Sequence, residues 1–138
     1  MIAYLDASVL LRIILVQPKS LVEWEAIQSS VASALVEVEC LRAIDRLRAR
    51  GVLSNPEFTH LRGVVYRMTE RIELVEPTGG ILRRAGQPMP TAVRTLDAIH
   101  LATALAWAEA RHADLVMATH DHELGAAALA NGLKVIGL

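Results

Sequence analysis

The order of strand-like and helix-like segments limits the fold of this chain more than any other feature. Five short apolar segments of the kind that form β-strands alternate with longer segments whose apolar residues recur at helical spacing. We expect strands at residues 2–5, 30–33, 71–76, 114–118 and 134–138. The clearest helices are expected at residues 34–50, 55–70 and 95–111. Strands that alternate with helices form a parallel sheet covered on both faces, so the sequence predicts an α/β fold.

Several helix starts carry a recognisable capping pattern. Two residue pairs have the spacing of a capping box: Ser20 with Glu23, and Ser54 with Glu57. In a capping box, the side chain of each residue bonds to the backbone N–H of the other. These pairs predict helices that begin near residues 21 and 55. Ser33 is expected to cap the helix that follows the second strand.

The composition is that of one folded domain spanning residues 1–138, because 53% of the residues are hydrophobic and only one cysteine is present. Cys40 excludes an internal disulfide, and we expect it to be a buried thiol in a reducing compartment. The most apolar run, residues 9–16, is too short to cross a membrane and contains Arg12. The first residues lack the basic segment that begins a secretory signal peptide, so we expect a cytoplasmic protein without a membrane segment.

Four carboxylates fall where a parallel sheet places its functional groups. Asp6 follows the first strand directly, and Asp121 follows the fourth. Asp97 lies in the first turn of its helix, and Glu39 lies two turns into the helix after the second strand. Sites in open α/β sheets lie outside the carboxyl ends of the strands, so these acids can converge. Converging carboxylates repel one another unless a divalent cation such as Mg²⁺ or Mn²⁺ is bound, and such a cation can activate water for attack on a phosphoryl group.

Other interpretations of these acids stay open at this point. Asp121 can be a plain helix cap, and Asp97 an ordinary acid at a helix N-terminus. Glu37 competes with Glu39, because helical periodicity does not choose between them. Glu123, in a first helical turn, is expected to be an ordinary surface acid.

The histidines are interpreted as structural residues. His120 and His122 flank Asp121, but alternate positions of a helix face different ways, so a zinc site there is disfavoured. His100 lies one turn after Asp97. We expect it to be a core residue or a hydrogen-bonding partner rather than a metal ligand.

The basic residues are unusual in kind and in distribution. The net charge is −1, which argues against non-specific nucleic-acid binding, yet 12 of the 14 basic residues are arginine. Arginine binds phosphate bidentately, whereas lysine does not. The arginines form two clusters that could contact phosphate groups, and the candidate residues are Arg42, Arg46, Arg83, Arg84 and Arg94. An Arg-rich codon usage explains the same composition without any function.

Four stretches together resemble one known family. They are "YLDASVLL", "SALVEVECLRA", "LDAIHLATAL" and "ATHDHELGAAALANGLKV". In order and spacing they resemble the motifs of PIN-domain ribonucleases, and in particular the VapC toxins of bacterial VapBC toxin–antitoxin systems. The match extends over most of the chain, while residues 52–90 carry little of the pattern. The histidines around Asp121 depart from the usual motif.

The resemblance implies a three-layer α/β/α fold with a five-stranded parallel sheet in the order 3-2-1-4-5. It implies a nuclease that cleaves RNA phosphodiester bonds with Mg²⁺ or Mn²⁺, on a structured target such as tRNA or rRNA. Its acidic quartet corresponds to Asp6, Glu39, Asp97 and Asp121, with Ser8 and Thr119 in supporting positions. Asp6 and Asp97 would hold the metal. The register of the second motif matches Ser33, Glu39 and Arg42, and so favours Glu39 over Glu37.

The resemblance also implies a VapB-like antitoxin as partner, and we expect a homodimer. Trp24, in a segment with several apolar residues, suggests a groove near the first helices for an antitoxin segment. Two other functions are considered. The first is a PIN-fold module that binds RNA or protein without cutting. The second is a phospho-acceptor receiver domain, which is disfavoured because Lys19 and Lys134 are remote in sequence from the acids.

Overall fold

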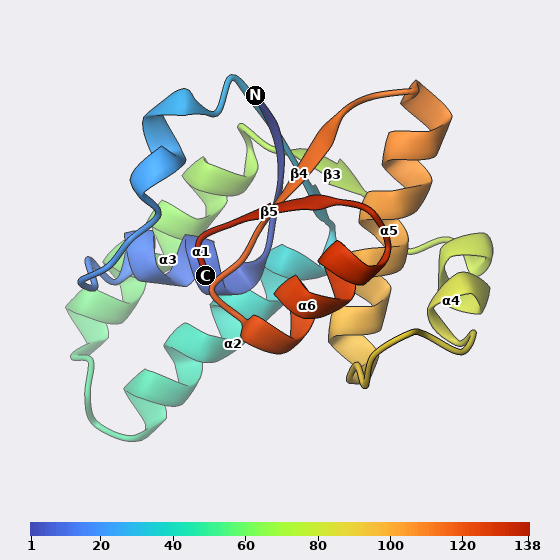
Figure 1. Ribbon diagram of the computed structural model, residues 1–138. Coiled ribbons are helices and arrows are strands. Elements are labelled where there is room, and N and C mark those ends of the chain that lie inside the picture. The colour runs from blue at the N-terminus through green and yellow to red at the C-terminus, as the bar shows by residue number, and fades with distance from the viewer.

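The computed structural model describes residues 1–138 and has three layers, with one sheet between two sets of helices (Figure 1). The strands are β1 (Ile2–Leu5), β2 (Ser29–Ser33), β3 (Glu73–Val75), β4 (Leu115–Ala118) and β5 (Lys134–Ile136). The helices are α1 (Ala7–Ile14), η1 (Val22–Ala26, a 3₁₀ helix), α2 (Leu35–Ala49), α3 (Asn55–Thr69), α4 (Gly79–Ala85), α5 (Thr95–Arg111) and α6 (His122–Ala130). All strand pairs are parallel and the order is β3-β2-β1-β4-β5, which confirms the expected fold.

The two faces of the sheet are covered by different helices. In β1, Ala3 and Leu5 point into a core formed with α1, α2 and α3, while Tyr4 points into a second core formed with α5 and α6. Because successive strand residues alternate between faces, a strand buried on both sides has a continuous apolar sequence, as "IAYL" does. The short helix α4 packs against α5.

Local capping sequences determine several helix boundaries. Ser54 and Glu57 form the expected capping box at the start of α3, with bonds of 3.2 Å and 3.1 Å between side chain and backbone. Ser33 Oγ accepts a hydrogen bond from the N–H of Leu35 at 3.2 Å, although Ala34 is the residue that caps α2 by backbone geometry. Gly51 follows α2 with a φ of +74°, a conformation that glycine adopts without strain.

The prediction of a capped α-helix from residue 21 is wrong. The segment forms the 3₁₀ helix η1, which Leu21 precedes without any side-chain cap, and Ser20 and Glu23 do not bond to each other. The chain must be extended again at Ile27 to enter β2 at Ser29. The few residues between Leu21 and Ile27 suffice for little more than one helical turn, and short helical turns are commonly 3₁₀.

Cys40 is a free thiol in the core between the sheet and α2, as the sequence predicts. Burial, together with the negative charge of Glu39, raises the pKa of Cys40 to about 12. The thiol therefore stays protonated at neutral pH and is a poor nucleophile. None of the helices combines the length and the apolar character that a membrane crossing requires.

Candidate active site

The sheet order reverses between β1 and β4, and two of the predicted acids, Asp6 and Asp121, follow the carboxyl ends of these strands. Leu5 pairs with Ala118 at the end of the ladder. The backbone N–H of Asp6 then donates to the carbonyl of Ala118 at 3.1 Å, so Asp6 and Thr119 leave the sheet side by side. A point where strand order reverses is the usual place for a site in such folds, because the two connections run to opposite faces and leave a crevice.

Asp6 is buried, with 6% of its surface exposed, and its carboxylate is held by two hydroxyls. Oδ2 accepts hydrogen bonds from Ser8 Oγ at 2.6 Å and from Thr119 Oγ1 at 2.9 Å, while Oδ1 bonds to no protein group. Asp6 also caps α1 through the N–H of Ser8 at 3.4 Å. The capping and the chemical interpretations of Asp6 are therefore compatible. One oxygen is anchored and the other is available to a ligand.

Ser8 and Thr119 connect Asp6 to the turn that carries Asp121. The N–H of His120 donates to Ser8 Oγ at 3.0 Å, and the N–H of Asp121 donates to Thr119 Oγ1 at 3.0 Å. Each hydroxyl thus accepts from the backbone of this turn and donates to Asp6. The two residues that the resemblance places in supporting positions lie between two of the predicted acids.

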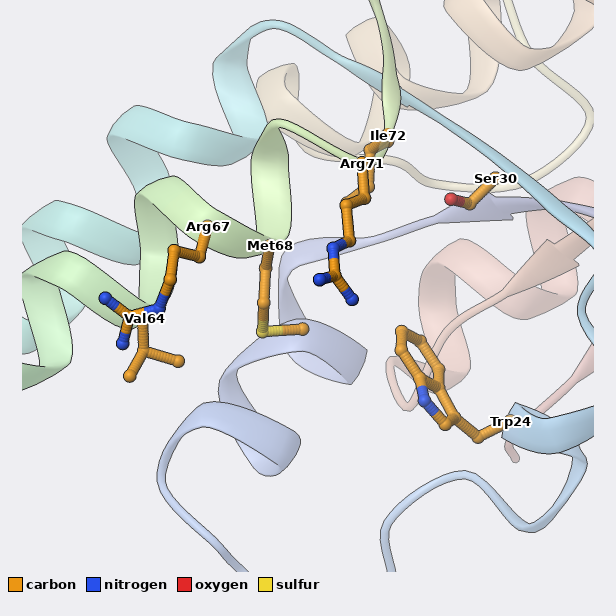
Figure 2. Close-up of a pocket in the computed structure, with 7 residues that line it drawn as sticks. All are labelled: Trp24, Ser30, Val64, Arg67, Met68, Arg71 and Ile72. Carbon is orange, nitrogen blue, oxygen red and sulfur yellow. The ribbon is translucent and has the colours of Figure 1, made fainter.

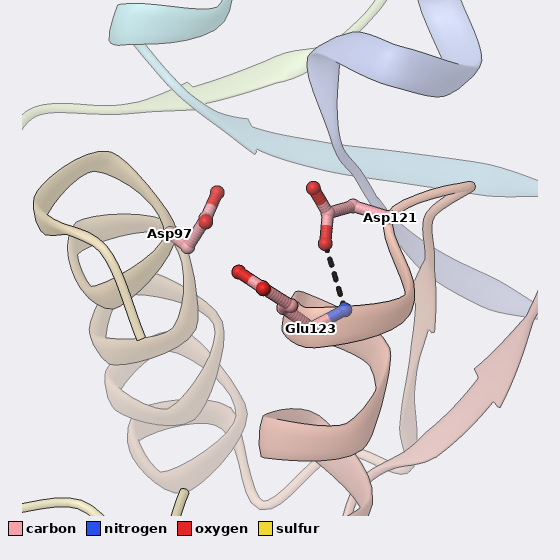
Figure 3. Close-up of side chains that lie close together, drawn as sticks. All are labelled: Asp97, Asp121 and Glu123. Carbon is pink, nitrogen blue, oxygen red and sulfur yellow. Dashed lines mark hydrogen bonds between the residues drawn. The ribbon is translucent and has the colours of Figure 1, made fainter. Parts of the chain in front are cut away.

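Asp97, Asp121 and Glu123 bring their carboxylates together at the N-termini of α5 and α6 (Figure 3). One oxygen from each lies within 4.8 Å of the others. Asp121 caps α6 through Oδ1, which accepts from the N–H groups of Glu123 and Leu124 at 2.8 Å and 3.0 Å. The capping interpretation of Asp121 is thus correct as well, and its Oδ2 is left with one long contact, to Arg94 at 3.5 Å.

The ionised carboxylate of Asp97 is destabilised by its surroundings. Burial raises the pKa of its carboxyl above the usual range, and the charge of Asp121 raises it further, against the opposing effect of Arg94. Asp6 is also near enough to raise this pKa. Asp97 Oδ2 is buried and accepts no hydrogen bond. A buried carboxylate oxygen without a donor is uncommon, and a bound cation would remove this cost.

Glu39 and Glu37 have different surroundings. Glu39 reaches from α2 across to α5, where its Oε2 lies 2.6 Å from His100 Nε2. Glu37 instead accepts a hydrogen bond from the hydroxyl of Thr69, at the end of α3, at 2.7 Å. His100, which adjoins Glu39, also feels the charges of Asp6 and Asp97. The structure therefore directs Glu39 toward His100 on α5 and Glu37 toward Thr69 on α3, while the acids it brings within 4.8 Å of one another are Asp97, Asp121 and Glu123.

The donor set fits a hard divalent cation. Asp6 Oδ1 and Glu39 Oε1 form no hydrogen bond with the protein, and Asp97 Oδ2 and Asp121 Oδ2 each lie 3.5 Å from the guanidinium of Arg94. All are carboxylate oxygens, the ligands that Mg²⁺ and Mn²⁺ prefer. His120 does not belong to the group of acids that lie together. Its Nδ1 bonds to the carbonyl of Gly137 at 2.6 Å, and its Nε2 is buried without a hydrogen-bond partner.

Arg94 lies next to the acids and not on a separate surface. Its Nε is 3.5 Å from Asp97 Oδ2 and 3.8 Å from Glu123, and its Nη2 is 3.5 Å from Asp121. The side chain is 75% exposed, so these ion pairs are long and solvated. This positive charge partly offsets the repulsion among the carboxylates.

The remaining predicted arginines lie at different places. Arg42 pairs with Asp45 at 2.7 Å, and Arg42 and Arg46 both line an apolar hollow of about 390 Å³ that includes Glu39. Arg84 forms a two-bond ion pair with Glu109, at 2.7 Å and 2.8 Å. Arg83 is exposed in the last turn of α4 and forms no ion pair.

Sequence reasoning missed the place of Glu123 and the local role of Arg94. A first-turn acid such as Glu123 is common at helix N-termini, so its sequence context gives no sign of a site. Its proximity to Asp97 arises because the N-termini of α5 and α6 meet at the same edge of the sheet. A signal was available for Arg94, which lies three residues before Asp97, the spacing of neighbours on a helix.

Comparison with known proteins agrees with this geometry. The family model of the PIN domain matches residues 3–130. The chain is also 34% identical over 140 residues to "Ribonuclease VapC35" from two strains of Mycobacterium tuberculosis. These matches cover 96% of this chain and 94% of the relative. The chain therefore belongs to the PIN-domain family.

Proposed function

We propose that this protein is a toxin-type endoribonuclease that hydrolyses RNA phosphodiester bonds with a divalent cation, Mg²⁺ or in its place Mn²⁺. The observation that carries the proposal is the set of weakly bonded carboxylate oxygens, above all the buried Oδ2 of Asp97, which accepts no hydrogen bond and forms only a long ion pair with Arg94, at 3.5 Å. The family membership and the name of the relative support the same function.

The proposed roles follow from the surroundings of each acid. Asp6 and Asp97 would hold the cation, because each is buried or half-buried and has an oxygen free of protein hydrogen bonds. When bound, the cation supplies activation of water and neutralises charge on the phosphoryl group. Glu39 and Asp121 would complete the negative field of the site, either as further ligands of the cation or by accepting a hydrogen bond from the attacking water and so orienting it.

The direct test is cleavage of RNA by the purified protein. We expect cutting with Mg²⁺ or Mn²⁺, no cutting with EDTA, and recovery when excess Mg²⁺ is added back. Total tRNA and rRNA are suitable substrates, since we propose a structured target cut in a single-stranded loop, where bases can be splayed apart. RNA that is bound but stays intact with every metal would favour the non-cutting module, and cleavage in EDTA would exclude metal dependence.

RNA binding is proposed to use the predicted arginines. Arg42 and Arg46 line the hollow beside Glu39, where they could contact phosphates next to the cut. Arg94 is close enough to the acids to contact the scissile region. Arg83 has no acidic partner, whereas the guanidinium of Arg84 is already engaged by Glu109.

Replacement of Arg83 by Ala is expected to weaken RNA binding and to reduce its salt dependence. Each lost phosphate contact lowers the slope of log K against log salt by about 0.7 for single-stranded RNA. The effect of Arg84→Ala should be smaller, because Glu109 already neutralises this side chain. Arg111→Ala, which removes the same charge from a side chain that is paired with Glu73, is the control. Unchanged binding and slope for Arg83→Ala would favour codon usage as the origin of this arginine.

A VapB-like antitoxin is the proposed partner, and Trp24 is proposed to form part of its seat. Trp24 borders a hollow of about 320 Å³ between α1 and η1, and a second pocket of about 290 Å³ against α3. In the second pocket the indole faces Met68 and Arg71 (Figure 2). A partly apolar hollow with charged residues at its margin is suited to one face of an amphipathic helix. We also propose a homodimer that acts in the cytoplasm.

A further inference from the structure

A chain of buried hydrogen bonds crosses the protein interior and ends on Glu39. The N–H of Ser33, at the end of β2, donates to the hydroxyl of Tyr4 at 3.0 Å. The same hydroxyl lies 2.9 Å from His100 Nδ1, and His100 Nε2 lies 2.6 Å from Glu39 Oε2. Tyr4 and His100 are both 0% exposed. The chain thus joins β1, β2 and α5 to one carboxylate of α2.

The direction of these bonds follows from their two ends. The backbone N–H of Ser33 can only donate, and the carboxylate of Glu39 can only accept. His100 Nε2 therefore carries a proton toward Glu39. For a neutral imidazole, Nδ1 accepts from the hydroxyl of Tyr4, so each polar group in the chain has a partner of the right kind.

The orientation of Glu39 depends on His100. Glutamate has three side-chain torsions and loses much rotamer freedom when it is ordered. The bond from His100 is the only hydrogen bond that the Glu39 carboxylate forms, and its Oε1 bonds to no protein group. The imidazole in turn is held by its bond to Tyr4 and by an edge-to-face contact with the phenol ring, at 5.9 Å between centroids.

We infer that His100, held by Tyr4, is a positioning residue that presents Oε1 of Glu39 to the cation site and thereby sets the affinity for the cation. This inference rests on the proposed function, since it names a support for that same site. Partners that orient a metal-ligating carboxylate contribute to affinity without touching the metal, because the ligand no longer has to be ordered on binding.

The test compares two amides at position 100. In His100→Gln the amide N–H can reach the position of Nε2 and donate to Glu39, whereas in His100→Asn the shorter amide reaches only the position of Nδ1. Mn²⁺ binding to the RNA-free protein, followed by the EPR signal of free Mn²⁺, is the readout. We expect His100→Asn to weaken Mn²⁺ binding by about 10- to 100-fold, and His100→Gln to stay within a few-fold of the parent.

Two further variants separate positioning from general damage. Thr69→Val removes the hydroxyl that donates to Glu37 on the same helix and should leave Mn²⁺ affinity unchanged. In a Glu39→Gln background, His100→Asn should cause no additional loss, because its effect passes through Glu39. If circular dichroism shows that His100→Asn is unfolded, Tyr4→Phe provides the test, with an expected loss of several-fold in Mn²⁺ affinity.

The outcomes distinguish this inference from the proposed function. Equal Mn²⁺ affinity in the parent, His100→Gln and His100→Asn would overturn the positioning role and leave the metal site intact. If His100→Asn is unfolded and Tyr4→Phe binds Mn²⁺ as tightly as the parent, the positioning role is overturned as well. A parent protein that binds no Mn²⁺ would overturn the proposed metal site, and the positioning role with it.

Discussion

Asp97→Asn is expected to abolish RNA cleavage and, at the same time, to stabilise the metal-free protein. Asparagine keeps the shape of aspartate but removes the charge that would hold the cation. Charge stabilisation by a catalytic cation contributes several kcal/mol, so we expect kcat/KM to fall by at least about 100-fold. Cleavage of a fluorescent RNA by equal amounts of folded parent and variant measures this loss.

The gain in stability has a defined pH dependence. The pKa of Asp97 is raised in the folded state by burial and by the charge of Asp121. Folding of the metal-free parent therefore becomes less favourable as pH rises from the ordinary aspartate pKa to the raised one, and the penalty then stays constant. Asp97→Asn lacks this penalty. In EDTA at neutral pH we therefore expect its Tm to be higher than that of the parent, and the difference should shrink as pH falls to the ordinary aspartate pKa.

Addition of Mn²⁺ should reverse the order of the two proteins. A ligand that binds only the folded state stabilises it by about 2.7 kcal/mol at 100 times its Kd, so the parent should gain several degrees and Asp97→Asn much less. A variant that cleaves RNA as fast as the parent, or that gains as much from Mn²⁺, would contradict the assignment of Asp97.

Glu39→Gln and Glu37→Gln form the second prediction, and each is the control for the other. The two residues lie on the same helix, both accept a hydrogen bond, and both substitutions remove one charge. We expect Glu39→Gln to reduce kcat/KM by at least about 100-fold, since we propose that its carboxylate completes the negative field of the cation site. Glu37→Gln should stay within a few-fold of the parent.

The stabilities of these variants indicate whether an effect on activity is specific. Glutamine at position 37 still has a carbonyl that can accept from Thr69, so we expect the free energy of unfolding to change by less than about 1 kcal/mol. Thermal unfolding in EDTA checks this value. Loss of cleavage in Glu37→Gln, with activity retained in Glu39→Gln, would mean that Glu37 belongs to the site.

Much of the fold could be predicted from the sequence because its signals are local. "IAYL" and "LVMA" are short apolar runs, and the capping box of Ser54 and Glu57 predicts the start of α3. The wrong prediction of a capped α-helix from residue 21, where the structure has η1, has a different origin. Ser20 and Glu23 have the right spacing, but the chain has to be extended again at Ile27, so tertiary structure overrides the local preference.

The site was only partly predictable. Asp6 and Asp121 follow strands that are neighbours in the sheet, so the parallel order alone brings them to one edge. The choice between Glu39 and Glu37 could not be made from helical periodicity, and came from the resemblance to the family. In the structure the two residues differ through partners on other elements: His100, 61 residues away, and Thr69, 32 residues away.

Local sequence patterns are enough to predict the alternation of strands and helices, and with it the edge of the sheet at which Asp6 and Asp121 lie, because hydrophobic period and capping are properties of neighbouring residues. Packing between distant segments brings Glu123 and Arg94 to Asp97 and Asp121, and brings Tyr4 and His100 to Glu39. These contacts arise where α2, α5 and α6 meet across the sheet. Their distances depend on how whole elements pack, which no local pattern contains.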